Sequence, residues 1–478
     1  MAALADGKAD NKLGVVRATA YVVGNVIGSG IFIAPSFIAA RVGSVGLSLS
    51  VWVVCGLVTL LKALCYIELA TSVRKAGGDF AYLHFVGWHA VAFSTMFVLT
   101  LLSLSLSNAT LSRAFAGYIV EGLTVILPHK DADSIHGAAI WLALGLMLFL
   151  CWANLLSLTK YAANLQVVIT VAKLSIIALI VAAGFYALIF KGQTENLESP
   201  FEDSNWELGN FVLTCYSGMF AYTGVAILAY GLDDLKKPKT TLVTATSAAV
   251  VIVVVAYLSI NLSFFAVLPK EEIIRTPAVA VVFSKKALSF FVYVLPLLVG
   301  LQISGSVNAT IFITSRTMMA SSKKGFLPTM LGLLNKEHQS PRIAVIVHTL
   351  LSMASLFAGD LEQLIIYQNY VNTIQVTASG FALLYIKIWK VPVHSDAIKM
   401  PLFVPILLVL VELFMAVVPV VEDWKATAVG LGFLCFGFAI YFSLVHPKST
   451  AEILRRVDEK TTIACQILAD CESFDKEK

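Results

Sequence analysis

The sequence predicts an all-α membrane protein with twelve transmembrane helices and both termini in the cytosol. Three observations support this prediction: 58% of the 478 residues are hydrophobic and only 13% are charged, long stretches carry almost no charge, and Lys and Arg gather in alternate loops. Soluble domains carry about 25% charged residues. The composition therefore excludes a cytosolic enzyme, a disordered regulator and a secreted disulfide scaffold, and a net charge of +4 is too small to indicate nucleic-acid binding.

The spans are placed at runs that are poor in charge, because each charge at mid-membrane costs about 2.5–3.5 kcal/mol and a spanning helix needs about 20 residues. The first run, 18–40, has no charged residue and ends at Arg41. It is too long for the apolar part of a signal peptide, and another run follows almost at once. The further spans are predicted at 44–69, 90–122, 138–158, 163–190, 210–230, 240–267, 289–319, 343–358, 362–386, 401–421 and 426–446.

The orientation follows from the loops, because Lys and Arg mark the cytosolic side of a membrane protein. With the amino terminus inside, 23 Lys and Arg residues fall in inner loops and tails, and 7 fall in outer loops. Both ends are therefore predicted to be cytosolic.

The domain organisation is predicted as a membrane core between two cytosolic tails. The segments are a tail (1–13), a core (14–446) made of a first repeat (about 14–191), a second repeat (about 208–388) and two extra helices (about 400–446), and a second tail (447–478). Apolar residues of the second tail recur near helical spacing, at Ile453, Val457, Ala464, Ile467 and Leu468. This spacing predicts either an amphipathic helix on the inner membrane face or an ordinary solvated helix, with equal weight.

Two spans, the first and the sixth, contain small residues where a continuous helix disfavours them. Residues 24–32 read GNVIGSGIF, with three glycines in seven residues, and residues 217–224 read SGMFAYTG. A glycine inside a helix costs about 1 kcal/mol relative to alanine, and unwound backbone at membrane depth is tolerated only where it lines a cavity. Close helix packing is the alternative explanation for either span alone. Because spans one and six hold corresponding places in two five-helix halves, the pair favours an inverted-repeat transporter with a binding site at mid-membrane.

The chemistry of such a site follows from the groups that an interrupted helix exposes. The N–H groups at the start of a half-helix present about half a positive charge, which suits a carboxylate. The carbonyl groups at the end of the preceding half-helix accept hydrogen bonds from an ammonium group. The two interrupted spans therefore predict a site for a zwitterion, and a free α-amino acid is the obvious candidate.

Five stretches resemble the L-type amino acid transporters of the amino acid–polyamine–organocation superfamily. They read GNVIGSGIFIAPSFIAARVGSVGLSLSVWVVCG from residue 24, ALCYIELATSVRKAGGDFAYL from 63, VAKLSIIALIVAAGF from 171, YSGMFAYTG from 216 and GSVNATIFITSR from 305. The resemblance covers essentially the whole chain. It implies a LeuT-type fold, with a 5+5 inverted repeat plus two extra helices, and sodium-independent amino acid exchange.

The resemblance also implies which residues bind the substrate. The amino and carboxylate groups of the substrate would be held by Ile27, Gly28, Ser29, Gly30 and Ile31. Span six would complete the amino-group site with Phe220, Ala221 and Thr223. Phe220 resembles the aromatic residue that closes over bound substrate from outside, and a core aromatic is the alternative of equal weight.

Lys173 lies in an otherwise apolar span, where an ionisable residue indicates function by default. The resemblance implies that this lysine is a fixed cation, at the place where sodium sits in sodium-driven relatives of the fold. Backbone carbonyls of span one and the hydroxyls of Ser304 or Ser306 in span eight are its expected partners. A lysine that extends its amino group to the membrane surface is the alternative.

The chain departs from the family in ways that bear on partners and substrate. Family members usually carry a cysteine between spans three and four that forms a disulfide with a single-pass glycoprotein, and residues 127–141 (LPHKDADSIHGAAIW) have none. A heavy chain is therefore expected only as a non-covalent partner. Thr223, Gln368, Asn369 and Asn372 would make a polar pocket for small or polar neutral amino acids, unless these groups only bond neighbouring helices.

Several alternatives stay open. Lys62, Arg113 and Glu412 are charges inside predicted spans with no family counterpart, and Glu412 is either a proton site or one half of a structural pair. Besides an exchanger in the plasma membrane, the sequence allows a proton-coupled symporter or an amino acid sensor that does not transport. No repeated charge ring indicates a channel, and no catalytic set, metal cluster or cofactor motif indicates an enzyme.

Overall fold

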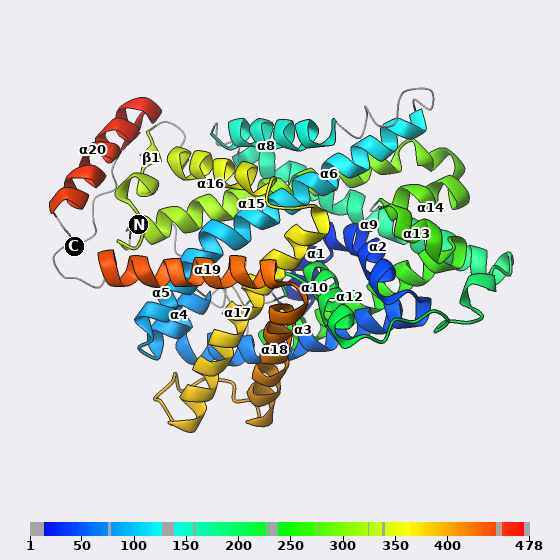
Figure 1. Ribbon diagram of the computed structural model, residues 1–478, viewed down its shortest axis with the longest axis horizontal. Helices are drawn as coiled ribbons and strands as arrows, with labels where there is room; N and C mark the ends of the chain where they lie inside the picture. Colours follow the sequence, from blue (N-terminus) through cyan, green and yellow to red (C-terminus); the bar gives the residue numbers. More distant parts are fainter. Residues whose placement is uncertain are drawn as a thin grey trace. The chain divides into compact units, whose positions relative to one another are not determined.

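The computed structural model describes residues 14–74, 78–126, 138–155, 159–225, 228, 238–276, 278–323, 325–336, 340–445 and 452–472 (Figure 1). Almost all of them are helical. The α-helices are α1 (Val15–Val26), α2 (Gly30–Val42), α3 (Val45–Val73), α4 (Gly78–Phe85), α5 (His89–Val98), α6 (Leu104–Ile126), α8 (Ala139–Leu155), α9 (Thr159–Phe190), α10 (Leu208–Ala221), α12 (Pro238–Val267), α13 (Lys270–Arg275), α14 (Val279–Ala287), α15 (Leu295–Lys323), α16 (Arg342–Ser355), α17 (Leu361–Ile388), α18 (Phe403–Glu422), α19 (Trp424–Ile440) and α20 (Glu452–Ala469).

Shorter elements complete the described chain. They are the π-helices η3 (Leu99–Ser103) and η8 (Tyr441–Val445), the 3₁₀ helices η4 (Glu195–Leu197), η6 (Ser289–Val292) and η7 (Thr329–Gly332), and the antiparallel strands β1 (Leu334–Asn335) and β2 (Cys471–Glu472). The two strands were not expected from the sequence, because two residues carry no recognisable alternation.

A helix lies at each of the twelve predicted spans, which confirms an all-α, multi-pass membrane protein. Among the described residues, seven helices are long and apolar enough to cross a membrane, and the bent pair α1–α2 makes an eighth span. The helices α8 and α16 are apolar but shorter. Span three is continuous from α5 through η3 to α6.

The structure refines two predicted boundaries. In span six, α10 ends at Ala221, within the segment where the sequence predicts an interruption. Span eight begins not at residue 289 but with α15 at Leu295, after the 3₁₀ turn η6. The loop at 127–137, and residues 226 and 227 after the second break, lie outside the described residues.

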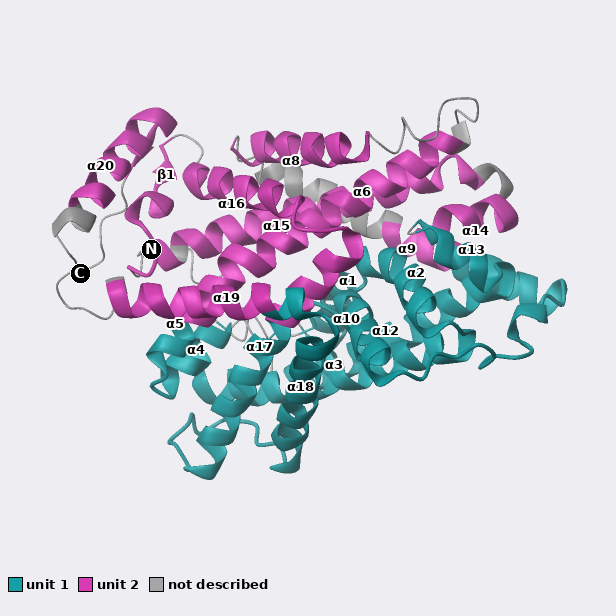
Figure 2. Cartoon of the chain, in the orientation of Figure 1, with its two compact units in different colours: residues 1–92, 180–279, 372–427 teal, residues 93–179, 280–371, 428–478 magenta. Residues whose placement is uncertain are grey.

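The chain forms two compact units, and each takes segments from both halves of the sequence (Figure 2). Unit 1 comprises residues 1–92, 180–279 and 372–427, and unit 2 comprises 93–179, 280–371 and 428–478. Both interrupted spans, α1–α2 and α10, therefore belong to unit 1. The long helices α9 and α17 contribute to both units.

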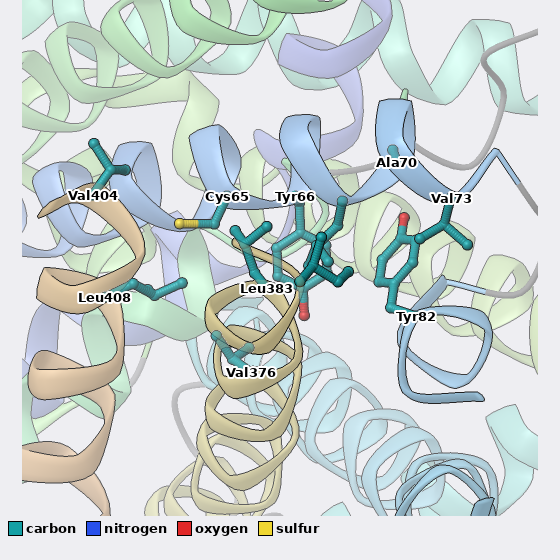
Figure 3. Packing of buried hydrophobic residues seen from close by; sticks show 11 residues of the cluster. Cys65, Tyr66, Ala70, Val73, Tyr82, Val376, Leu383, Val404 and Leu408 are labelled. Atoms are coloured by element: carbon teal, nitrogen blue, oxygen red, sulfur yellow. The ribbon is translucent and has the colours of Figure 1, made fainter. Parts of the chain in front are cut away.

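One apolar core of unit 1 joins α3, α4, α17 and α18 (Figure 3). Its buried side chains include Cys65, Tyr66, Ala70, Val73, Tyr82, Val376, Leu383, Val404 and Leu408. Burying such side chains stabilises the folded state by about 25 cal/mol per Å² of apolar surface. Two helices of this core, α3 and α18, also pack against α10, the helix of the interrupted sixth span.

Candidate binding site at the helix breaks

The first break separates α1 from α2, as the glycine spacing predicts. The helix α1 ends at Val26, the N–H of Ile27 donates to the carbonyl of Val23 at 2.9 Å, and residues 27–29 leave the helix. The helix α2 then begins at Gly30, bent by 50° from α1. The predicted interruption of span one is therefore confirmed.

The start of α2 presents N–H groups that have no internal partner. No side chain caps this start in the described chain, and the N–H of Phe32 donates to the carbonyl of Ser29 at 3.0 Å. The N–H groups of Gly30 and Ile31 have no hydrogen-bond partner among the described residues. Because orphan N–H groups at a helix start carry about half a positive charge, this end of α2 can bind an anion.

The second break lies a turn later than the sequence indicates. Ser217 and Gly218 remain inside α10, and the chain turns only at residues 222–225. A Cβ atom at Gly218 would lie 2.7 Å from the Sγ of Cys55 in α3. Gly218 therefore serves close helix packing, which was the alternative explanation for small residues in a span.

The two breaks meet in unit 1. A Cβ atom at Gly30 would lie 2.5 Å from the Cα of Ala221, so the start of α2 packs directly on the end of α10. The amide of Asn25 donates to the carbonyl of Gly224 at 3.0 Å. Gly224 has φ of +92°, a conformation that L side chains rarely adopt. These contacts hold the two unwound segments side by side.

Tyr257 of α12 joins the same two segments. Its hydroxyl lies 3.0 Å from the carbonyl oxygen of Val26 and 2.7 Å from that of Ala221, the last residues of α1 and α10. The side chain is buried and packs against Trp52 and Tyr222. Sequence reasoning missed this residue, and the one available signal was a phenol hydroxyl within an apolar span.

The other predicted site residues occupy different settings. The segment Ile27–Ile31 forms the first break, while Phe220 and Ala221 are buried at the end of α10. Thr223 is exposed, and its hydroxyl donates to the carbonyl of Phe220. Asn372 is half-buried in α17. The structure thus brings the span-one and span-six residues together, and the substrate roles stay predictions.

Lys173 of α9 is buried, with 6% of its surface exposed. This burial disfavours a side chain that extends to the membrane surface. The hydroxyls of Ser304 and Ser306 donate within α15, to the carbonyls of Leu301 at 2.7 Å and Gln302 at 3.4 Å. A hydroxyl oxygen can still accept a hydrogen bond, and the role of Lys173 as a fixed cation stays a prediction.

The charges left unassigned by the sequence have structural partners. Lys62 of α3 forms an ion pair with Glu412 of α18 at 2.9 Å, and the Glu412 side chain is fully buried. The guanidinium of Arg113 donates to the carbonyl of Leu356. Glu412 is therefore one half of a pair. In the part of the chain that the structure describes, no cluster of His, Cys, Asp and Glu could hold a metal ion.

Comparison with known proteins agrees with this geometry. The sequence profile of the family described as "Amino acid permease" matches residues 13–452. The chain is 37% identical to amino acid transporter protein 6 of Caenorhabditis elegans over 444 residues, which cover 93% of this chain and 84% of the relative. It is 31% identical to the human cystine/glutamate transporter (96% and 90% covered) and 30% identical to Asc-type amino acid transporter 1 of the mouse (94% and 84% covered).

Three findings agree on a single assignment. The family profile spans nearly the whole chain, the relatives are transporters, and the bent first span contacts an interrupted sixth one. The chain belongs to the amino acid permease family and is a multi-pass membrane transporter of amino acids, not an enzyme.

Proposed function

We propose that the protein is a sodium-independent exchanger of small or polar neutral L-amino acids, which works by alternating access. One observation carries the proposal: the unpartnered N–H groups at the start of α2 lie against the end of α10, so donors and carbonyl acceptors converge in one place. A zwitterion needs both kinds of group at a spacing of a few ångströms.

Main-chain groups at the two breaks bind different ends of the substrate. The substrate carboxylate accepts hydrogen bonds from the N–H groups of Gly30 and Ile31, which the helix dipole favours. The substrate ammonium donates to the carbonyls of Val26 and Ala221, which lie 3.0 and 2.7 Å from the hydroxyl of Tyr257, the donor to one of them at a time. A carbonyl oxygen has two lone pairs, so it can serve both donors. The glycine at position 30 is required because any side chain there would collide with Ala221.

Sodium independence rests on Lys173. A buried ammonium group fixed in span five would supply the positive charge that a bound sodium ion supplies elsewhere, so transport would need no cation gradient. The burial of this side chain supports that role. Phe220, buried beside the second break, would close the site from outside.

The substrate class is proposed from side chains near the second break and in span ten. Polar side chains there favour small or polar neutral amino acids over large apolar ones. They are Thr223, Asn372, Gln368 and Asn369. The relatives' printed names span cystine and glutamate, Asc-type and large neutral amino acids, so these names support amino acid transport and leave the side chain open.

The proposals on a partner protein and on the membrane rest on a relative's name and on the positions of the cysteines. A further relative, from the rat and 29% identical, is named "large neutral amino acids transporter small subunit 2", and the words "small subunit" support a second protein as partner. All seven cysteines carry unpaired thiols, and each lies in a span or the carboxyl-terminal tail, so we propose non-covalent pairing at the plasma membrane with both termini cytosolic. A non-reducing gel should show no reducible band of higher mass.

The test is uptake by the purified full chain in liposomes, without sodium. Labelled serine should enter only when unlabelled serine is trapped inside, and Gly30→Ala should abolish most of this exchange while Gly24→Ala preserves it. Uptake into empty liposomes driven by external acid would replace exchange with proton symport. Binding of serine with no uptake under any gradient would identify a sensor instead.

A further inference from the structure

The helices α6 and α16 of unit 2 pack against each other and carry buried polar side chains (Figure 1). Five of these side chains have 0% of their surface exposed, and we call them the polar seam. They are Ser105, Asn108 and Ser112 of α6, and His348 and Ser352 of α16. None of the five takes part in the contacts between the helix breaks described above.

Two contacts fix how α6 and α16 lie along each other. The amide of Asn108 donates to the hydroxyl of Ser352 at 3.5 Å, and further along both helices the guanidinium of Arg113 donates to the carbonyl of Leu356. The partners are 244 and 243 positions apart in the sequence. Because this separation is nearly constant, the two helices run in the same direction and keep one register.

This register brings the remaining members of the seam to the same contact. Ser105 and Ser112 lie three residues before and four residues after Asn108, so the three side chains share one face of α6. The same register places Ser105 level with His348 of α16. The polar seam is therefore one continuous row of side chains between the two helices.

The hydroxyl of Ser352 determines which atoms of its neighbours can donate. Its single proton is donated to the carbonyl of His348 at 2.9 Å. The hydroxyl oxygen then only accepts, from the amide of Asn108 and from the Nε2 of His348, both at 3.5 Å. A neutral imidazole has one N–H group, and a buried imidazole is neutral because an unpaired charge there is costly. The Nδ1 of His348 is therefore a hydrogen-bond acceptor.

Four polar atoms of the seam have no hydrogen-bond partner among the described residues. They are the Nδ1 of His348, the Oδ1 of Asn108 and the hydroxyl oxygens of Ser105 and Ser112. Buried polar groups in proteins are nearly always bonded, either to other protein groups or to ordered water. Side chains three or four positions apart on a helix have Cβ atoms about 5–6 Å apart, a separation that one water molecule bridges. A buried water needs two to four polar partners, and the seam supplies them.

We propose that the polar seam is an internal hydration site of unit 2. One water donates to the Oδ1 of Asn108 and accepts from a serine hydroxyl one turn away on α6, and another donates to the Nδ1 of His348. Water fits because the seam offers both donors and acceptors, whereas an ion would be buried there without an opposite charge. The proposal does not depend on which amino acid is carried.

The test is radiolytic labelling of the full chain in nanodiscs, read out by mass spectrometry of its peptides. X-ray pulses convert bound water into hydroxyl radicals in place, and these radicals oxidise the side chains that touch the water. We expect His348 to be oxidised at least about threefold faster than Phe93, because buried water lies only at polar sites. Phe93 is the dry control, since it is 1% exposed and packs against the rings of Phe97 and Phe326. Oxidation of His348 no faster than that of Phe93 would overturn the proposal.

The double variant Ser105→Ala/Asn108→Leu keeps His348 and removes its polar neighbours on α6. Oxidation of His348 should fall about threefold, to the rate of Phe93, because a water with a single polar partner is not retained. Asn154→Leu is the matched control in the same unit, since that amide donates to the carbonyl of Leu150 at 2.8 Å and to Asn308 at 2.7 Å, and it should leave the oxidation of His348 unchanged. Undiminished oxidation in the double variant would also overturn the proposal, and the comparison within the parent stands even if that variant does not fold.

Discussion

Unit 1 contains two polar regions inside a membrane protein, and they are built in opposite ways. The two helix breaks expose main-chain groups without any charged side chain. The region at α3, α4, α17 and α18, called here the brace, uses charged side chains that are paired with opposite charges or with hydrogen-bond donors. Glu68 pairs with Lys387 at 2.5 Å and Lys62 with Glu412 at 2.9 Å.

Asp79 of α4 is a carboxylate of the brace that is held by hydrogen-bond donors. Its carboxylate accepts hydrogen bonds from the hydroxyl of Tyr66, the amide of Gln375 at 2.6 Å and the hydroxyl of Ser379 at 2.7 Å. The three donors come from α3 and α17, so Asp79 ties α4 to both. Burial nevertheless raises the pKa of Asp79, although the three hydrogen bonds oppose this shift.

The difference shows that a polar group in the membrane is not by itself a sign of function. A buried charge without a partner costs several kcal/mol, so charges are retained in the brace only as pairs. An orphan N–H group at a helix start costs less and can be left open for a ligand. Variants of the brace should therefore affect stability, and variants of the breaks should affect transport.

The largest effect is expected for Glu412→Gln, which leaves Lys62 unpaired. The unfolding free energy should fall by about 3–5 kcal/mol, measured as a drop in the midpoint of thermal unfolding. Exchange per folded molecule should stay near that of the parent. The double variant Lys62→Met/Glu412→Leu removes both charges and should recover most of the stability; a double variant as unstable as the single one would show that the pair is not the cause.

The substitution Gly30→Ala should disturb the contact between the two breaks and lower exchange. The added methyl group collides with Ala221, so α2 must shift, at a cost of about 1–3 kcal/mol. Exchange should fall about tenfold or more, measured with labelled substrate in liposomes. Gly24→Ala is the matched control, because a Cβ atom there has nothing within 4 Å. Equal loss in both variants would contradict the contact between the breaks.

Asp79→Asn should lower the unfolding free energy by about 1–3 kcal/mol at neutral pH, because one donor loses its acceptor. Burial raises the pKa of Asp79 in the folded protein, so the folded state binds the proton more tightly than the unfolded state, and falling pH stabilises the parent. The gap between the melting points of parent and variant should therefore widen from pH 7 to pH 5. A gap that narrows would show that the carboxylate is favoured by folding.

The smallest effect is expected for Tyr257→Phe, which removes one neutral hydrogen-bonding group worth about 0.5–1.5 kcal/mol. Exchange should fall several-fold with little change in melting point, because the carbonyls of Val26 and Ala221 lose the hydroxyl that joins them. Tyr222→Phe is the control, since the hydroxyl of Tyr222 donates to the carbonyl of Trp52 in α3 at 2.9 Å and not to a carbonyl of the breaks. If both variants lose exchange equally, the hydroxyl of Tyr257 has no special place at the breaks.

The sequence predicted the helices better than it predicted the contacts between them. The glycines at 24, 28 and 30 indicated the first break, because the backbone freedom of glycine acts at its own position. The same argument assigned Gly218 to the second break, where the structure shows a packing contact with Cys55 instead. A glycine that permits unwinding and one that permits close packing have the same local pattern.

The sequence alone determined the class of protein, the positions of the spans and the interruption of span one, because hydrophobicity and backbone preference are properties of short segments. Only the tertiary structure decided that Tyr257 joins the two breaks, that Lys62 pairs with Glu412, and that Asn108 of α6 lies opposite Ser352 of α16. Each of these depends on which distant segment lies opposite, and packing sets that choice.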